Sequence, residues 1–226
     1  MISTLKDDDF CFAWSPPSPS PGKDRAALRK ALQWPRGSVI RISFLDGDPA
    51  LWESVEREAR GWTAPGLANL ALSFRRDTTA TDVRISFRFS GSWSLVGTGC
   101  QRRTDLTMPT MNFGGLADKP PAELRAVVLH EFGHALGLVH EHQSPAGGIS
   151  WDKPRVYAAL SYWDKATVDH NVFEPYAAAE TNFTRFDPTS IMMYPFPASW
   201  TLDGFSSPRN LELSDTDKAF IHEQYP

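Results

Sequence analysis

The chain has 226 residues, 41% of them hydrophobic and 22% charged, with a formal net charge of −4 at pH 7. This length and apolar content suffice for one globular domain with a substantial core, or for two subdomains on either side of a cleft. The sequence has no Lys/Arg block, which excludes a basic nucleic-acid-binding protein, and no apolar run of about 20 residues, which excludes a membrane-spanning helix.

Residues 1–36 are predicted to form an N-terminal arm or a pro-segment. Residues 15–21 consist only of Ser and Pro, a composition that stays extended and builds no core, and 24–34 could form a short helix. The first residues lack the basic and apolar regions of a signal peptide, so a removed leader, another export route and an intracellular location all stay open. Cys11 and Cys100, the two cysteines of the chain, form either one disulfide or two free thiols.

The next part of the chain alternates between strands and a helix. A turn at 46–49 leads into a helix of about 50–62, and we interpret Asp46 and Asp48 there as turn and cap residues rather than as a calcium site. Pro109 favours an edge position for the last predicted strand. The segments with a strand pattern are 39–44, 70–74, 83–89, a short strand within 91–99, and 107–113.

A helix of about 122–137 follows, and it carries the pattern H-E-x-x-H-x-x-G-x-x-H. His130 and His134 are one turn apart, so one helix face can present both imidazoles to a single cation. Gly137 can adopt positive φ and end the helix, which lets the chain turn back and bring in His140. Three neutral nitrogens with an open fourth position are typical of a catalytic zinc site. Glu131 is placed to reach a water on that cation. A bare HExxH arises by chance, but the added Gly and His make chance a poor explanation.

Beyond His140 the chain is predicted to be helical at 151–163 and 165–173, then largely irregular over 174–210. A closing helix begins after Ser214, with Asp217 at its third position as in a capping box. The remaining histidines are interpreted as ordinary surface or hydrogen-bonded residues: His142, His170 and His222.

The histidine motif resembles the zinc signature of the metzincin metalloproteases, and Glu141 after the third His is similar to the astacin branch, in particular to compact microbial members. The segment 190–195, Ser-Ile-Met-Met-Tyr-Pro, resembles the astacin Met-turn, although Met193 stands where astacins usually have His. The resemblance spans roughly 38–226. It implies an α+β fold whose N-terminal subdomain (37–139) has a mixed twisted sheet and two long helices. The C-terminal subdomain (140–226) would be mostly irregular with helices, with an active-site cleft between the two.

The resemblance also implies a zinc-dependent endopeptidase that acts as a secreted monomer on protein or peptide substrates. One catalytic Zn²⁺ would be held by His130, His134 and His140 and would activate a water, with Glu131 as general base. Tyr194 would stabilise the oxyanion, and Met192 would form the floor of the site. Glu141 would make a structural ion pair or hydrogen bond. A substrate strand could pair with the edge near 109–113.

Cys11 is a candidate latency switch, because a thiolate on a flexible arm could become the fourth zinc ligand. The carboxylates of Asp7, Asp8 and Asp9 could act in the same way, whereas a Cys11–Cys100 disulfide or an idle thiol is the structural alternative. The rival functions are a latent or non-catalytic zinc-binding module for partner recognition and a zinc hydrolase with a non-protein substrate. The retained Glu131 favours an enzyme.

Overall fold

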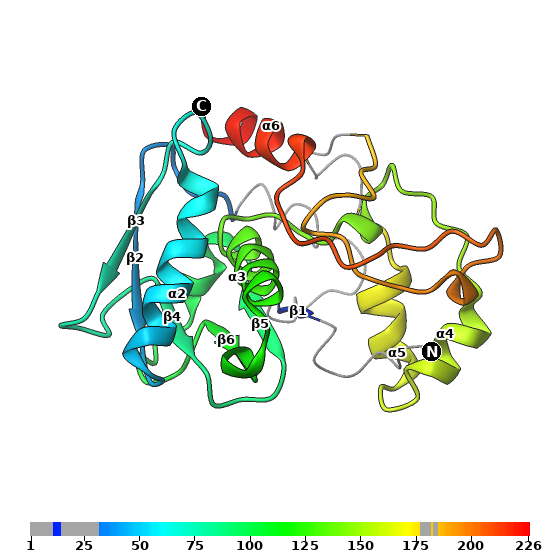
Figure 1. Cartoon of the computed structure of the whole chain (residues 1–226), viewed down its shortest axis with the longest axis horizontal. Coiled ribbons are helices and arrows are strands. Elements are labelled where there is room, and N and C mark those ends of the chain that lie inside the picture. The colour runs from blue at the N-terminus through cyan, green and yellow to red at the C-terminus, as the bar shows by residue number, and fades with distance from the viewer. Residues whose placement is uncertain (1–10, 15–31, 177–181, 183–184) are drawn as a thin grey trace.

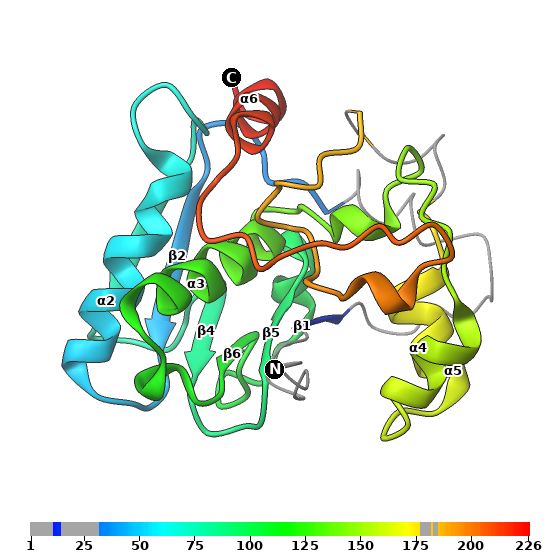
Figure 2. The ribbon, with the colours of Figure 1, turned by 45° about the vertical axis from the view of Figure 1, so that its right-hand side comes forward.

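A six-stranded sheet organises the first half of the molecule (Figures 1 and 2). The computed structural model describes residues 11–14, 32–176, 182 and 185–226, and for 11–14 only the backbone. The strand order is β1-β5-β6-β4-β2-β3, and neighbours are parallel except for the antiparallel pair of β5 and β6. The strands are β1 (Cys11–Trp14), β2 (Val39–Phe44), β3 (Ala71–Arg75), β4 (Val83–Ser86), β5 (Ser92–Leu95) and β6 (Met111–Phe113).

The predicted edge position of the 107–113 strand is wrong. β6 begins only at Met111 and lies between β5 and β4, so it is an internal strand. Pro109 precedes the strand, and its missing N–H therefore costs the sheet no hydrogen bond. β5 pairs with β6 on one side and with β1, the outermost strand of the sheet, on the other. The other predicted strands form close to their expected positions, with β4 shorter than 83–89.

Two helices pack together over the sheet: α2 (Pro49–Ala59) and α3 (Pro121–Ala135) (Figure 2). The Asp48 side chain accepts a hydrogen bond from the Ala50 N–H at 2.8 Å, which confirms its interpretation as a cap. Pro121 occupies the first turn of α3, where its missing N–H is harmless. Gly137 follows the end of α3 with φ of +100°, as predicted for a residue that terminates the helix.

The second half has a core of its own, and few of its residues are in regular elements. It contains α4 (Lys153–Ala159), α5 (Lys165–Val168) continued by a π-helical turn at Asp169–Phe173, and short 3-10 turns at Glu141–Gln143 and Ala198–Trp200. The buried residues of this core are Val156, Leu160, Val168, Val172, Met193, Tyr194, Phe196 and Trp200. The predicted α+β class is therefore confirmed.

The last helix, α6 (Asp215–Gln224), returns to the sheet half (Figure 1). Ile221 and Tyr225 belong to the same core as α2, α3 and the sheet. The Tyr225 hydroxyl donates to the Leu136 carbonyl at 2.6 Å, at the end of α3. None of the helices that the structure describes is long and apolar enough to cross a membrane.

The two cysteines have different outcomes. Cys100 is a buried free thiol in the main core, and burial raises its pKa to about 12. It is therefore an inert apolar residue at neutral pH. Cys11 is the first residue of β1, and its side chain lies outside the described part of the chain, as do Asp7, Asp8, Asp9 and most of the predicted 24–34 helix.

Candidate metal centre

Three histidines converge at the end of α3. His130 and His134 come from the helix, and His140 comes from the segment that turns back after Gly137. One nitrogen of each ring lies within 4.8 Å of the others, so the three could share one metal ion. The structure thus brings together all three residues that the motif predicted as ligands.

Backbone carbonyls fix the orientation of two of these rings. His130 Nδ1 lies 2.7 Å from the Ile191 carbonyl oxygen, and His134 Nδ1 lies 2.9 Å from the Leu138 carbonyl oxygen. A carbonyl only accepts, so each Nδ1 carries the proton and each Nε2 keeps its lone pair. Such outer hydrogen bonds are usual for histidines that bind metals.

The lone pairs at the centre fit a metal. His130 Nε2 is buried and has no hydrogen-bond partner, which is costly unless a ligand satisfies it. His134 Nε2 and His140 Nε2 are 3.1 Å apart. Two nitrogens on a tetrahedral zinc are separated by about 3.3 Å, given Zn–N bonds of about 2.0–2.1 Å.

Burial keeps these rings in the form that binds metal. It lowers the pKa of His130 to about 4, against the raising effect of the Ile191 carbonyl and with a smaller lowering effect of Arg209. Burial also holds the pKa of His140 well below its ordinary value, and the neighbouring histidines add to this. Neutral imidazole is the species that coordinates zinc, so no proton has to leave at neutral pH.

Glu131 follows His130 in α3 and is almost fully buried, with 1% of its surface exposed. A carboxylate is rarely taken out of water without a charged or polar partner. Its burial at a site with three histidines is consistent with the position that the motif predicted for it.

Met192 packs against α3, the helix that carries His130 and His134. A Cβ atom built on Gly133 would be 2.4 Å from Met192 Sδ and 3.1 Å from Trp62 Cζ2, so only glycine allows this approach. Gly133 was not singled out from the sequence. Its signal was available, because glycine inside a helix destabilises it by about 0.5–1 kcal/mol and needs a packing reason.

Tyr194 is buried against the histidines. Its ring centroid is 4.2 Å from that of His140, 4.3 Å from that of His142 and 6.3 Å from that of His130. His142 is not part of the three-histidine group; it is buried, and its Nε2 lies 2.9 Å from the Asn171 carbonyl oxygen. His170 is exposed and pairs with Glu174, and exposed His222 lies near the Leu67 carbonyl.

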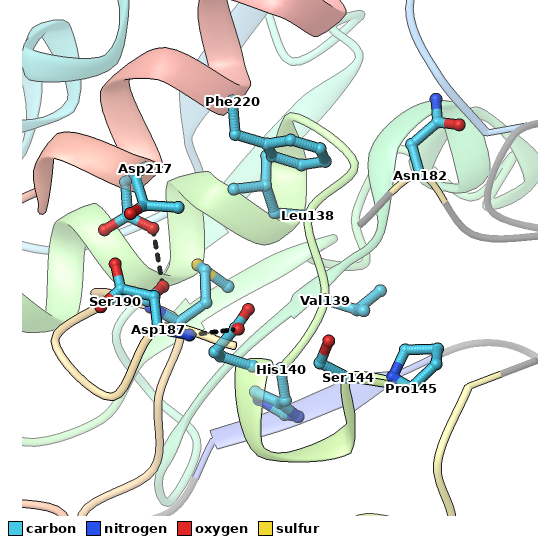
Figure 3. Close-up of a pocket in the computed structure, with 13 residues that line it drawn as sticks. Leu138, Val139, His140, Ser144, Pro145, Asn182, Asp187, Ser190, Asp217 and Phe220 are labelled. Atoms are coloured by element: carbon cyan, nitrogen blue, oxygen red, sulfur yellow. Dashed lines mark hydrogen bonds between the residues drawn. The ribbon is translucent and has the colours of Figure 1, made fainter. Parts of the chain in front are cut away.

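A small cavity of about 30 Å³ is lined by His140, Glu141 and Asp217, among other residues (Figure 3). Two acidic side chains that line this cavity accept hydrogen bonds from neighbouring residues. Glu141 Oε1 accepts from the Asp187 N–H at 2.9 Å, which confirms the predicted structural hydrogen bond of Glu141. Asp217 accepts from the Ser190 hydroxyl at 2.6 Å. Sequence reasoning named Asp217 as a helix cap and missed this contact.

Comparison with known proteins identifies a close structural relative. Two solved structures of myroilysin are each 38% identical in sequence and cover 87% of this chain, with TM-scores of 0.83 and 0.67 and coverage of 97% and 86% of myroilysin. The hatching-enzyme zinc protease HCE-1 of Oryzias latipes, a medaka fish, has a TM-score of 0.57 at 16% identity, over 85% of this chain and 93% of that one; it shows likeness of fold alone.

Among curated proteins, nematocyst expressed protein 6 of Nematostella vectensis is 32% identical over 124 residues, which is 54% of this chain. The chain matches only 38% of the length of that relative. No protein-family model matches the sequence.

Proposed function

Because this chain belongs to the astacin-like zinc metalloproteases of the metzincin group, we propose that it is an endopeptidase that hydrolyses peptide bonds with Glu131 as general base. The observation that carries the proposal is the three-histidine centre, with its orphaned His130 Nε2. It fits a metal with three protein ligands, and an open fourth position is what separates catalytic from structural zinc.

His130, His134 and His140 would hold one Zn²⁺ through their Nε2 atoms. When bound, zinc supplies a water nucleophile that is reactive at neutral pH and polarises the scissile carbonyl. The carbonyls of Ile191 and Leu138 keep the rings in the required tautomer.

Glu131 would accept the proton of the attacking water and pass it to the leaving amine. Its place beside His130 and its exclusion from bulk water suit a carboxylate that exchanges protons with the reacting groups rather than with solvent. A degraded, non-catalytic zinc module would have no use for a buried carboxylate in this position, and this favours the enzyme over that rival.

Tyr194 and Met192 would complete the site. The Tyr194 ring packs on His140, beside the metal ligands, and its hydroxyl would donate a hydrogen bond to the oxyanion of the tetrahedral state. Met192 packs against Gly133 of α3, the helix that carries His130 and His134, and would serve as the apolar floor.

The substrates would be proteins or peptides in extended conformation, cleaved by a secreted monomer. Because β6 is internal, a substrate strand would pair instead with the side of β5 that faces away from β6. An extended backbone can add to such an edge with main-chain hydrogen bonds. The chain's own β1 uses the same edge. We therefore propose that the N-terminal arm keeps the enzyme latent, with Cys11 as the residue that would reach the metal.

The test compares the wild-type chain with Glu131→Gln in cleavage of casein, with zinc content measured for both. We expect the variant to keep one zinc per chain and to lose activity by about 10²–10⁴-fold. Glu123→Gln, the same change in the first turn of α3, is the matched control and should cleave like the wild type. A Glu131→Gln variant with normal activity would overturn the mechanism. A wild type that holds zinc but cleaves nothing, even without residues 1–21, would favour the non-catalytic module.

A further inference from the structure

The backbone around Ile191 links the last helix to the metal centre. The Asp217 Oδ2 atom accepts a hydrogen bond from the Ile191 N–H at 2.8 Å. The carbonyl of the same residue, Ile191, lies 2.7 Å from His130 Nδ1. Asp217, 26 residues beyond Ile191 in the sequence, therefore holds the residue whose carbonyl contacts a metal ligand.

The contacts of Asp217 exceed those of an ordinary helix cap. It makes the capping box with Ser214, whose N–H donates to Asp217 Oδ2 at 2.9 Å. The other carboxylate oxygen of Asp217, Oδ1, accepts a hydrogen bond from the Ser190 hydroxyl, and Asp217 is 5% exposed (Figure 3). In the same helical turn Asp215 is fully exposed and pairs with Lys218 at the surface. Capping alone does not require a carboxylate to be buried.

The Ser190 hydroxyl extends the contact to Met192. Ser190 Oγ accepts from the Met192 N–H at 3.0 Å while it donates to Asp217. Asp217 therefore holds two consecutive peptide groups of the segment 190–195, one directly and one through Ser190. The second of these contains both the Met192 N–H, which donates to Ser190 Oγ, and the Ile191 carbonyl, which orients His130.

The hydrogen bonds from the Met192 N–H to the Ser190 hydroxyl and from that hydroxyl to the Asp217 carboxylate polarise the peptide group that joins Ile191 to Met192, which makes the Ile191 carbonyl a better acceptor. A stronger hydrogen bond at His130 Nδ1 makes the opposite nitrogen a better metal ligand and fixes the ring. We propose that Asp217 is a positioning residue for the metal centre: it holds the Ile191 N–H directly and the Ile191–Met192 peptide group through Ser190, and in this way it orients His130 and increases its affinity for zinc. This inference rests on the proposed zinc site, but not on the role of Glu131.

The experiment measures the zinc dissociation constant of the full chain by competition with a chelator. Asp217→Asn keeps the shape of the side chain and removes its charge. We expect zinc to bind about 10–100-fold more weakly, the range found for partners of metal ligands. Asp215→Asn is the matched control, because it removes the same charge from the same turn without contact to 190–195; its zinc affinity should equal that of the wild type.

Urea unfolding of the metal-free chains separates this role from capping. Ser214→Ala removes the N-cap side chain but leaves the Asp217–Ile191 contact, so it should lower the stability of the metal-free chain and leave zinc affinity unchanged. Asp217→Glu keeps the charge and should recover part of the affinity. The proposal is overturned if Asp217→Asn binds zinc like the wild type, or if Ser214→Ala loses as much affinity as Asp217→Asn.

Two further results keep the test decisive. If Asp217→Asn does not fold, Ser190→Ala takes its place; it should weaken zinc binding in the same direction by a smaller factor, and unchanged binding would overturn the proposal. Glu131→Gln should keep wild-type zinc affinity. Failure of the general-base mechanism would therefore appear as activity in that variant, whereas failure of this inference would appear as unchanged zinc affinity in Asp217→Asn.

Discussion

At the residue scale, the hydroxyl of Tyr194 is expected to act in the transition state only. Tyr194→Phe keeps the ring packed against His140 and His142 but removes the proposed donor to the oxyanion. We expect kcat to fall about 10–100-fold with KM nearly unchanged, because the lost bond does not form in the ground state. Steady-state kinetics with a peptide substrate measure both constants. Tyr157→Phe is the control, since its hydroxyl bonds Asp169 away from the histidines. Equal losses in the two variants would speak against a catalytic hydroxyl.

A second residue-scale prediction concerns Gly133. Gly133→Ala would place Cβ 2.4 Å from Met192 Sδ and force the floor of the site to move. We expect a loss of about 1–3 kcal/mol in unfolding free energy, as for other overpacked cores. Gly61→Ala, whose Cβ would meet only Leu129 Cδ2 at 3.1 Å, should cost less. Urea unfolding compares the variants, and adding Met192→Ala to Gly133→Ala should recover stability relative to the sum of the two single changes. Strictly additive changes in unfolding free energy would show that the two residues do not interact.

The sequence predicted the side-chain part of the centre and missed its backbone part. His130, His134 and His140 are recognisable because imidazoles at helical spacing, followed by a glycine, have few structural explanations. The carbonyls of Ile191 and Leu138 leave no such signature, because every residue has a carbonyl and only the fold decides which one faces a ring. The link from Asp217 was hidden behind its more common role as a cap.

At the scale of elements, the pair of Arg41 and Asp82 joins β2 to the turn before β4. Asp82 accepts from the Arg41 N–H at 2.9 Å and from its guanidinium at 3.0 Å, and the carboxylate side chain is 6% exposed. Burial acts to raise the pKa of Asp82, but the hydrogen bonds from Arg41 and Gln101 outweigh it, so the pKa lies below 3.8. A folded-state pKa below the unfolded value means that the pair stabilises the fold above pH 3.8. That stability is lost as the pH falls through the lowered pKa.

Asp82→Asn should therefore destabilise the chain by about 1–3 kcal/mol at neutral pH, the usual contribution of hydrogen bonds to a charged group. The difference from the wild type should shrink in acid, once Asp82 of the wild type is protonated. Urea unfolding at a series of pH values measures it. Asp77→Asn breaks the exposed pair with Arg75 and should change stability little at any pH. A constant difference between wild type and Asp82→Asn down to the lowest pH would refute the linkage.

The elements themselves were predictable where a pattern was long and periodic. The helices α2 and α3 carry apolar residues at helical spacing and begin with Asp or Pro signals, and both form near their predicted bounds. β6 shows why sheet order is harder. A proline near a short strand is compatible with an edge or with a position just before the strand, and only pairing with both β4 and β5 decides between them.

At the scale of the whole molecule, the two hydrophobic cores meet at adjacent residues. Met192 belongs to the core of the sheet and α3, whereas Met193 and Tyr194 belong to the core of α4 and α5. Methionine replaces the histidine usual in astacins at position 193, and its side chain is buried in the second core. The metal centre is thus built where the two cores join, so relative movement of the halves would disturb Met192 and Tyr194 together.

The N-terminal arm supplies the last prediction. β1 runs parallel to β5 and, in Figures 1 and 2, lies on the side of the sheet that faces helices α4 and α5. A substrate backbone that paired with β5 would need the hydrogen-bonding edge that β1 occupies, so the two compete. If the arm occupies the site in nine of ten molecules, its removal raises activity about ten-fold. Proteolysis by the chain without residues 1–21 measures this.

Cys11→Ala separates the two ways in which the arm could act. A full rise in that variant would mean that the thiol holds the arm on the metal. No rise in Cys11→Ala, beside a rise on truncation, would mean that pairing of β1 with β5 is the inhibitory contact and that Cys11 is not the switch. Cys100→Ala, at the buried free thiol, is the control and should leave the activity of the folded full chain unchanged.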